Sequence, residues 1–456
     1  MTDLASRQHI HIVGVGGAGM SAIATVLAAM GHEVTGSDLK ASRALERLAT
    51  SGLDVRIGHD PANVAQADAV AISSAIPETN VEVSRARERG IPVLSRADVL
   101  SSIASLRRTV AVAGTHGKTT TSSMLSLILV EAGLHPSFII GGDVNDIGTN
   151  AVWDSGEWLV VEADESDGTF LRLRPEIAVV TSLEPDHLEH YGGFEELRAS
   201  FERYVGEAAH AVVFADEPVA AGLGSVARPG SVLFGRSEQA RLAVRDVEGR
   251  RGNVSWSLTY GEADLGRFEL PMPGEHNALN ASAAVAAGLL IGVEPDAARR
   301  AIARFAGVAR RFEFRGERHG VTFVDDYAHL PGEVRAMLSA ARQGGFGRVV
   351  AVFQPHRYSR TQSLADQFAD AFEEADVVIV TAVYASGEAA RPGVSGQLVV
   401  DAVLTSHPGA DISYVPDHEG LLARLRQILR PGDLCLSLEA GDLAGLPDEM
   451  QADDRW

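Results

Sequence analysis

Short apolar runs alternate with helical segments through the N-terminal part of the chain. The runs rich in β-branched residues lie in "HIHIVGVG" (9–16), "HEVTGSD" (32–38), "ADAVAISSAI" (67–76) and "GIPVLS" (90–95). Between them, "GMSAIATVLAAMG" (19–31) and "NVEVSRARERG" (80–90) have helical composition, and each ends at a glycine. Strand, helix and strand at this spacing predict a parallel sheet with right-handed crossover connections.

The same alternation continues to the C-terminus. Apolar runs that end in polar residues recur in "RRTVAVAGTHGKTT" (107–120), "EWLVVEADESD" (157–167), "EIAVVTSLEPDHLEHYG" (176–192), "VTFVDDYAH" (321–329), "GRVVAVFQPHRYSRT" (347–361) and "GDLCLSLEAGD" (432–442). We therefore predict an α/β protein of three consecutive domains: a Rossmann-like domain over 1–107, a P-loop-type domain with a parallel sheet over 108–309, and a second Rossmann-like domain over 310–456.

Composition and charge narrow the classes of function. The 456 residues are 45% hydrophobic, and no run approaches the ~18 apolar residues of a membrane span, so we expect no membrane insertion. The net charge of −21 argues against nucleic acid as a partner, because phosphate contacts need a basic surface. The N-terminus does not have the pattern of a signal peptide, and Cys435 is the only cysteine, which suits a reducing cytoplasm.

The first glycine-rich motif is "GVGGAG" (14–19), which follows a predicted strand and precedes a predicted helix. Glycines at this spacing let the backbone approach a pyrophosphate at the helix N-terminus. Asp38 ends the next predicted strand, where a ribose-binding carboxylate is usual. The motif alone favours NAD or FAD, and a plain strand–helix turn is the alternative.

The second glycine motif, "GTHGKT" (114–119), is a more specific signal for phosphate. Of the 40 basic residues only Lys40 and Lys118 are lysines, so the lysine in this loop is distinctive. Lysine is a compact point charge that suits a phosphate cradle better than the wide arginine fork. The motif departs from the full eight-residue pattern, since Val112 stands where the first glycine is expected. We predict that the loop binds the phosphates of ATP, with Thr119 placed to bind Mg²⁺.

A metal ion would need further ligands. Glu162 and His187 each follow the end of a predicted strand in the same domain, where parallel sheets present ligands. Oxygen ligands suit Mg²⁺, and a histidine would suit Mn²⁺ as well. The alternative for His187 is a loop or helix-start histidine. Asp164, Glu165 and Asp167 have the composition of a solvated acidic loop.

Three further motifs are weaker when taken singly. "HNALN" (276–280) places Asn277 and Asn280 on one face of a helix start, either to bind a polar ligand or to cap the helix. "RRF" and "VDDYAH" supply Arg311, Asp325 and Asp326. "PHRYSRT" (355–361) supplies a cationic loop for an anionic substrate, or a helix start with exposed charges; its members are His356, Arg357 and Arg360.

Together these motifs resemble the Mur ligases of bacterial cell-wall synthesis. The resemblance extends over nearly the whole chain and rests on "GVGGAGMS", "GTHGKTTT", "EADESD", "EPDHLEHYG", "GEHNALNA", "RRFEFRGE", "VDDYAHLPGE" and "QPHRYSRT", which occur in that order. It implies an ATP-dependent ligase that joins L-alanine to the lactyl carboxylate of UDP-N-acetylmuramate through an acyl phosphate. The implied partners are these two small molecules, and the implied protein is a cytoplasmic monomer or homodimer.

The resemblance also assigns roles to residues. It implies a catalytic set of Lys118, Arg311, Asp326 and His329, and a metal set of Thr119, Glu162 and His187. In the third domain it assigns the amino acid and the muramoyl carboxylate to Tyr327, His329, His356 and Arg360. It implies ATP binding by Gly114, Thr115, His116, Gly117, Lys118, Thr119, Thr120, Asn277, Asn280, Arg311 and Asp326. It implies UDP-sugar binding by Gly16, Gly17, Ser73, Ser74, His187, His356 and Arg360, so the first glycine loop would hold a UDP pyrophosphate.

The chain departs from the family pattern at three points. Leu330 stands where a second histidine is usual, and Glu439 replaces a glycine in a "GAGD"-type turn, which puts close ligand approach there in doubt. No lysine follows Lys118, which excludes the carbamylated lysine of some sister ligases. Three alternative functions stay open: a dinucleotide-dependent oxidoreductase, a non-catalytic nucleotide or UDP-sugar sensor, and a ligase that recycles cell-wall peptides.

Overall fold

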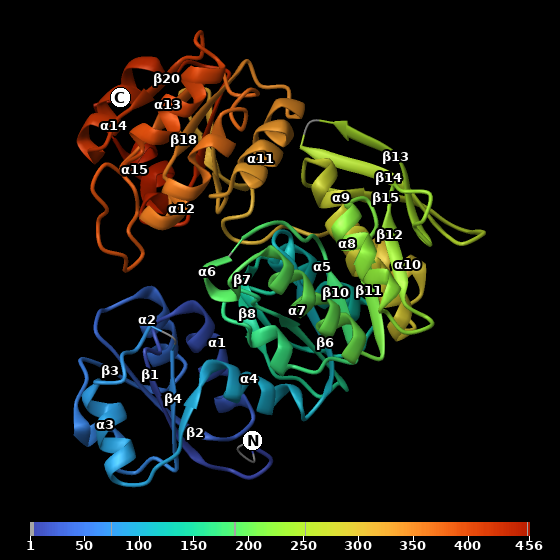
Figure 1. The fold of residues 1–456 in the computed structure, drawn as a ribbon, viewed down its shortest axis with the longest axis vertical. Helices are drawn as coiled ribbons and strands as arrows, with labels where there is room; N and C mark the ends of the chain where they lie inside the picture. Colours follow the sequence, from blue (N-terminus) through green and yellow to red (C-terminus); the bar gives the residue numbers. More distant parts are fainter. Residues whose placement is uncertain (1–3, 74, 187, 251, 454) are drawn as a thin grey trace. The chain divides into compact units, whose positions relative to one another are not determined.

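The chain folds into three sheets that are covered by helices. The computed structural model describes residues 4–456 except residues 74, 187, 251 and 454 (Figure 1). The chain divides into two compact units, of which the first runs to residue 245 and adds 257–268 and 279–306. The second unit comprises residues 246–256, 269–278 and 307–456.

The N-terminal sheet is parallel, with strand order β3-β2-β1-β4-β5. The order reverses beside β1, so that the carboxyl ends of β1 and β4 flank the switch point where such sheets bind ligands. The elements are β1 His9–Val13, α1 Ala18–Ala29, β2 Glu33–Asp38, α2 Arg43–Thr50, β3 Asp54–Ile57, the 3-10 helix η1 Pro61–Val64, β4 Ala69–Ile72, α3 Val81–Glu88, β5 Val93–Ser95 and α4 Arg96–Ala104.

The central sheet has ten strands in the order β15-β14-β13-β12-β11-β10-β6-β9-β7-β8. The strands from β13 to β7 in this order pair in parallel, as the sequence predicts. β8 differs, because it pairs antiparallel with β7 at the edge of the sheet. The reason is the four-residue connection between β7 and β8, which is too short for a parallel crossover.

The central elements alternate strands and helices before the outer strands. They are β6 Arg108–Ala113, α5 Lys118–Glu131, β7 Ser137–Val144, β8 Thr149–Val152, β9 Trp158–Glu162, η2 Thr169–Arg172, β10 Ile177–Val180, α6 Leu188–Tyr191, α7 Phe194–Glu207, β11 His210–Phe214, α8 Pro218–Gly222, η3 Leu223–Ser225, β12 Val232–Gly235, β13 Leu242–Arg250, β14 Asn253–Tyr260, β15 Ala263–Leu270, α9 Glu275–Ile291 and α10 Pro295–Ala303.

The C-terminal sheet has the order β16-β17-β21-β18-β19-β20, with β16 antiparallel to β17 and the other pairs parallel. Its elements are β16 Glu313–Arg318, β17 Val321–Asp326, α11 Pro331–Gln343, β18 Arg348–Phe353, α12 Tyr358–Leu364, η4 Ala365–Phe368, β19 Val377–Val380, α13 Gln397–Ser406, β20 Ile412–Tyr414, α14 His418–Ile428, β21 Asp433–Leu438, η5 Leu443–Gly445 and α15 Leu446–Ala452.

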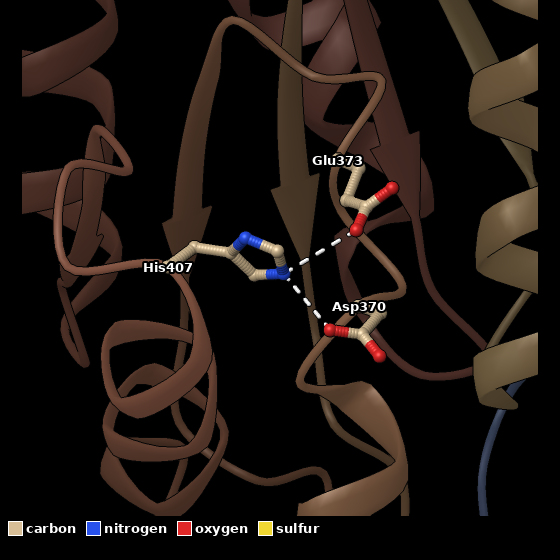
Figure 2. Close-up of side chains that lie close together, drawn as sticks. All are labelled: Asp370, Glu373 and His407. Carbon is tan, nitrogen blue, oxygen red and sulfur yellow. Dashed lines mark hydrogen bonds and ion pairs between the residues drawn. The ribbon is translucent and has the colours of Figure 1, made fainter.

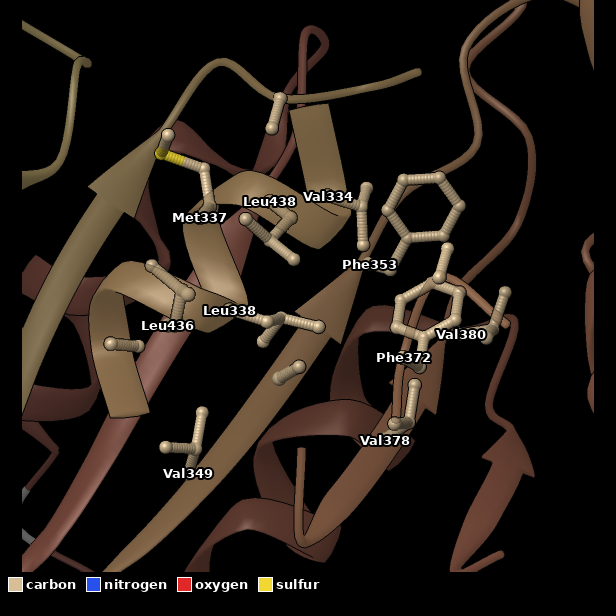
Figure 3. Packing of buried hydrophobic residues seen from close by; sticks show 14 of the residues in the cluster. Val334, Met337, Leu338, Val349, Phe353, Phe372, Val378, Val380, Leu436 and Leu438 are labelled. Carbon is tan, nitrogen blue, oxygen red and sulfur yellow. The ribbon is translucent and has the colours of Figure 1, made fainter. Parts of the chain in front are cut away.

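Strand periodicity divides the C-terminal core between the two faces of this sheet. Val349, Ala351 and Phe353 of β18 belong to a cluster with α11 and α13, whereas Val350 and Val352 belong to a cluster with α14 and α15. Successive side chains of a strand point to opposite faces, so a continuous apolar run serves both clusters. Figure 3 shows the first cluster, in which side chains of α11 pack on those of β18 and β21.

Helix length and hydropathy bear on membrane insertion. Within the described part of the chain, no helix is both long enough and apolar enough to cross a bilayer.

Candidate functional site

The first glycine loop connects β1 to α1 and is organised by the carboxyl end of β2. Gly14 has a φ of +81°, and a Cβ on Gly16 would lie 2.5 Å from the side chain of Leu45. The Gly16 N–H donates to Asp38 Oδ2 at 2.9 Å, so Asp38 stabilises the loop. Gly17 caps α1, which directs the helix N-terminus at the loop.

The strand beside this loop carries another predicted ligand. The N–H of Ser73 donates to the carbonyl of Val13 at 3.3 Å, which places Ser73 directly beside the end of β1. Ser74 lies outside the described residues. The structure therefore brings Gly16, Gly17 and Ser73 to one edge of the N-terminal sheet, as predicted.

The phosphate loop connects β6 to α5 and is held by the segment that follows β10. Gly114 has a φ of +135°, and a Cβ there would lie 2.3 Å from Thr181 Oγ1. Thr181 Oγ1 donates to the carbonyl of His116, and Ser182 Oγ accepts from the His116 N–H at 2.9 Å. Thr115 Oγ1 accepts from the Glu184 N–H at 2.9 Å. These bonds fix the loop before any ligand contributes.

Lys118 begins α5, and its ammonium group folds back over the loop. Nζ donates to the Gly114 carbonyl at 2.6 Å and to the Thr115 carbonyl at 3.3 Å, and it lies 2.8 Å from Glu165 Oε1. Glu165 is only 3% exposed, so it is not part of a solvated acidic loop. Burial raises the pKa of Glu165 to about 7, although the neighbouring ammonium opposes the rise.

Two of the three predicted metal ligands lie together. Thr119 Oγ1 donates to Glu162 Oε1 at 3.0 Å, and Glu162 Oε2 accepts from the Gly141 N–H at 2.7 Å. A hydroxyl and a carboxylate are the oxygen donors that Mg²⁺ prefers, so this pair fits the ion. His187 lies outside the described residues. Thr120 is buried in the first turn of α5.

Helix α9 carries both predicted asparagines, but their surroundings differ. A Cβ on Gly117, whose φ is +80°, would lie 2.2 Å from Asn280 Oδ1, so Asn280 borders the phosphate loop. Thr121 Oγ1 also donates to the Asn280 carbonyl, at 3.4 Å. Asn277 is buried and donates its amide to the Pro273 carbonyl at 2.7 Å. Asn277 therefore fastens the start of the helix in the structure.

In the second unit, Asp326 ends β17 and supports the turn that carries Arg311. Its Oδ2 accepts from the Phe312 N–H at 2.7 Å, and its Oδ1 accepts from the Ala328 N–H at 2.8 Å. Burial raises the pKa of Asp326 to about 7, while the charge of Arg311 opposes the rise. The guanidinium of Arg311 lies 5.3 Å from the ring centroid of Tyr327. Asp326 and Arg311, both predicted to be catalytic, therefore interact through charge and through the backbone of Phe312.

Aromatic and basic side chains gather at the carboxyl ends of β17 and β18. The ring of His329 lies 5.5 Å from that of Tyr327 and 5.3 Å from that of His356. His356 stacks on Tyr384 at 5.8 Å, and its Nδ1 lies 3.0 Å from Arg360 Nη1. The structure therefore brings His329, His356 and Arg360 together at one edge of the sheet, as predicted, and adds Tyr384 to the group.

A second group of metal-ligand types lies on the surface of this unit. His407 Nε2 lies 2.8 Å from Asp370 Oδ1 and 3.4 Å from Glu373 Oε1 (Figure 2). Both carboxylates are exposed, and His407 caps the C-terminus of α13, where a positive charge is favourable. The arrangement is that of a surface ion-pair cluster.

The sequence interpretation missed the residues that hold the loops. Thr181 and Ser182 gave no signal beyond lying after an apolar run. Glu165 was visible in "EADESD", but its ion pair with a lysine 47 positions away was not. Glu439 was seen only as a departure, whereas the structure buries it completely against Arg310.

These features define a class of protein. A fixed glycine loop at a helix N-terminus, with a lysine and a hydroxyl–carboxylate pair, is the arrangement of a P-loop-type nucleotide-binding domain. Family models then match three successive parts of the chain: "Mur ligase family, catalytic domain" at 9–108, "Mur ligase middle domain" at 112–288, and "Mur ligase, glutamate ligase domain" at 310–438.

Similar proteins agree with these models. The UDP-N-acetylmuramate--L-alanine ligase of Rubrobacter xylanophilus is 46% identical over 97% of this chain and 99% of its own length. The protein of the same name from Anaeromyxobacter dehalogenans (strain 2CP-1) is 44% identical over 99% of both chains. The chain belongs to the Mur ligase family.

Solved structures show the same three-domain fold. The UDP-N-acetylmuramate-alanine ligase of Thermotoga maritima has a TM-score of 0.83 at 28% identity, over 97% of this chain and 98% of its own. A MurF ligase of Thermotoga maritima in complex with ADP has a TM-score of 0.65 at 18% identity, over 99% of this chain and 98% of its own, and shows the fold alone.

Proposed function

We propose that this protein is an ATP-dependent ligase that joins L-alanine to the lactyl carboxylate of UDP-N-acetylmuramate, in the synthesis of peptidoglycan precursors. The observation that carries the proposal is the identity of 44–46% over nearly the whole chain to relatives named for this activity. Family membership favours a ligase over a dinucleotide-dependent oxidoreductase or a nucleotide sensor. We also propose that the protein acts in the cytoplasm and that its domains have the boundaries expected from the sequence: 1–107, 108–309 and 310–456.

The reaction has two steps. The lactyl carboxylate attacks the γ-phosphorus of ATP, which forms an acyl phosphate and releases ADP. The amine of L-alanine then attacks the acyl carbon, the amine loses a proton, and phosphate leaves with the bonding electrons. Both steps bring anions or developing negative charge together, so the site must supply positive charge where that charge develops.

The phosphate loop supplies much of this charge. Backbone N–H groups of 114–119 bind the phosphates, and Lys118 moves its ammonium from the loop carbonyls to the β- and γ-phosphate oxygens. Thr119 and Glu162 would hold Mg²⁺, or Mn²⁺, together with His187. The ion would neutralise phosphate charge and orient the γ-phosphate. Asn280, which borders Gly117, contacts the nucleotide, and Asn277 keeps this part of α9 in place.

Residues of the second unit have their own roles in the proposed reaction. Arg311 acts on the transferred phosphate, and Asp326 keeps Arg311 in position through the Phe312 N–H. His356 and Arg360 bind the lactyl carboxylate, while His329 is the candidate base for the amine. In the N-terminal domain, Gly16, Gly17, Ser73 and Ser74 bind the UDP-sugar.

Release of phosphate from ATP with Mg²⁺ tests the proposal. We expect release only when UDP-N-acetylmuramate and L-alanine are both present. Release that requires a tripeptide in place of L-alanine would assign the protein to peptide recycling. No release with any acceptor, together with binding of a nicotinamide dinucleotide, would refute the ligase.

A further inference from the structure

The turn that carries Arg311 is strained. Arg310 and Phe312, on either side of Arg311, have φ angles of +62° and +47°, which residues other than glycine rarely adopt. Such a conformation persists only where its surroundings over-determine it. The direction of the Arg311 side chain therefore depends on whatever holds its two neighbours.

The N–H of Phe312 donates to Asp326, which fixes one neighbour of Arg311. The other neighbour, Arg310, is fixed by hydrogen bonds from both its backbone and its side chain. The Arg310 N–H donates to Glu313 Oε2 at 2.8 Å, and the Arg310 carbonyl accepts from the Tyr327 N–H at 2.9 Å. Its guanidinium pairs with Glu439 Oε1 and also donates to the Glu439 carbonyl at 3.3 Å. The contact with Glu439 is the one that fixes the side chain.

Glu439 is itself built into the sheet. It is fully buried, its N–H donates to the Asp326 carbonyl at 3.0 Å, and its Oε2 accepts from the Gly441 N–H at 2.6 Å. Its position just after β21 leaves the carboxylate little freedom. The glutamate that departs from the family's glycine turn is therefore an anchor that points inward.

The negative charge of Glu439 also reduces the repulsion between two neighbouring guanidinium groups. The guanidinium groups of Arg310 and Arg311 lie 4.8 Å and 5.3 Å from the centroid of the same Tyr327 ring. Two cations near one ring repel each other unless a counter-ion neutralises one of them. Glu439 neutralises the charge of Arg310. A second carboxylate, that of Asp325, lies near the same guanidinium, with 3.7 Å between Asp325 Oδ2 and Arg310 Nε.

We propose that Glu439 is a positioning residue for the ligase reaction: by pairing with Arg310 it holds the strained 310–312 turn and so sets the direction of the Arg311 side chain. This inference rests on the proposed function, because it needs the assignment of Arg311 to ATP. Glu439 does not itself touch substrate.

The test compares Glu439→Gln with the wild-type protein. We expect kcat/KM for ATP to fall by roughly tenfold to a hundredfold, the scale of a small displacement of a positioned group. KM for UDP-N-acetylmuramate should change less than kcat/KM for ATP, because the hydrogen bonds of Glu439 go to Arg310, Asp326 and Gly441 and not to the proposed carboxylate ligands His356 and Arg360. Glu439→Asp, which keeps the charge, should retain more activity than Glu439→Gln.

A matched control separates positioning from stability. Asp433, at the other end of β21, is also buried and pairs with Arg348 at 2.7 Å and 3.0 Å. Asp433→Asn should lower the melting temperature and leave kcat/KM for ATP unchanged. An equal loss in Asp433→Asn, or a Glu439→Gln variant within twofold of wild type, would overturn the inference.

A double variant and a binding measurement complete the design. If Glu439 acts through Arg310, the loss of kcat/KM in the double variant Glu439→Gln/Arg310→Gln should be far smaller than the product of the losses in the two single variants. A loss in the double variant equal to that product would contradict the proposal. Titration with a fluorescent ATP analogue gives a second readout, in which Glu439→Gln should bind more weakly. An unchanged affinity for the ATP analogue in Glu439→Gln would refute the positioning role. Absence of ligase activity in the wild-type protein would instead refute the proposed function, so the two failures can be told apart.

Discussion

At the scale of single residues, the phosphate loop explains why a lysine stands at position 118 in a chain whose basic residues are nearly all arginines. The Lys118 ammonium lies within 3.3 Å of two backbone carbonyls and one carboxylate. A compact ammonium fits this space, whereas a planar guanidinium needs a wider one. The identity of the cation, and not only its charge, is thus set by the loop.

Lys118→Arg should therefore abolish turnover while the protein still folds. The wide fork cannot occupy the place of the ammonium between the Gly114 carbonyl and Glu165. Steady-state phosphate release measures the loss, and circular dichroism confirms folding. Activity within about tenfold of wild type would show that charge alone suffices.

Glu162→Ala should remove metal-dependent activity. The variant loses the carboxylate that lies 3.0 Å from Thr119 Oγ1, so much more Mg²⁺ should be needed to reach a half-maximal rate. Asp167→Ala is a suitable control, because Asp167 pairs with Arg96 instead. A wild-type Mg²⁺ requirement in Glu162→Ala would take Glu162 out of the metal site.

Glu82 should make the N-terminal domain sensitive to acid. Burial alone would raise the pKa of Glu82, but its interaction with His11 and hydrogen bonds from Ser37 and Asn63 outweigh burial and lower the pKa to about 2. The ionised carboxylate therefore stabilises the fold above pH 4.5, and this stabilisation is lost as pH falls toward 2.

Chemical denaturation of wild type and Glu82→Gln measures this effect. The pH-dependent difference in free energy of unfolding should be about 3 kcal/mol at pH 7 and less than half of that near pH 3. A difference that stays constant between these pH values would contradict the lowered pKa.

At the scale of elements, the predicted site residues lie in loops that follow strand ends and precede helix starts. β1, β6, β17 and β18 each end in a loop that carries predicted site residues, as parallel sheets generally do. α11 gives one detailed case. Glu333 Oε2 accepts from the N–H groups of His329 and Leu330, at 2.9 Å and 3.1 Å, just ahead of this helix. Leu330 is buried, so this departure from the family pattern serves packing.

Glu333→Ala should affect both stability and rate. Loss of these two hydrogen bonds at the start of α11 should cost about 1–2 kcal/mol of stability, as for other helix caps. It should also lower kcat, since the backbone of His329 loses its acceptor. Thermal unfolding and phosphate release measure the two effects. Loss of stability with an unchanged kcat would exclude a role for the His329 position in turnover.

At the scale of the whole molecule, the sequence predicted the parallel sheets, and the structure places many of the predicted site residues in loops at the ends of their strands. Runs such as "TVAVAG" and "VVIV" combine β-branched residues with glycine or polar ends, which is a strong local signal. The outer strands β13 and β14 lack such runs, and their alternation of apolar and polar residues was not recognised, whereas the end of β15 was expected as a strand at 267–270. The edge strand β8 is only four residues long, so it gave little pattern.

Long-range pairs were beyond the reach of one sequence. Arg310 and Glu439 are 129 positions apart, and neither lies in a motif that names the other as its partner. The contact of Asn280 with Gly117 likewise depends on how α9 packs beside the phosphate loop. Packing of separate elements sets such pairs, and local propensity carries no information about it.

The scarcity of lysine has a spectroscopic consequence. Protein labelled with ¹⁵N only at lysine should give two side-chain ammonium resonances, one from exposed Lys40 and one from Lys118, whose side chain is only 17% exposed. Protons on a buried, hydrogen-bonded ammonium exchange slowly with water, which favours detection of the Lys118 signal. The Lys118 signal would report directly on the phosphate loop as nucleotide is added.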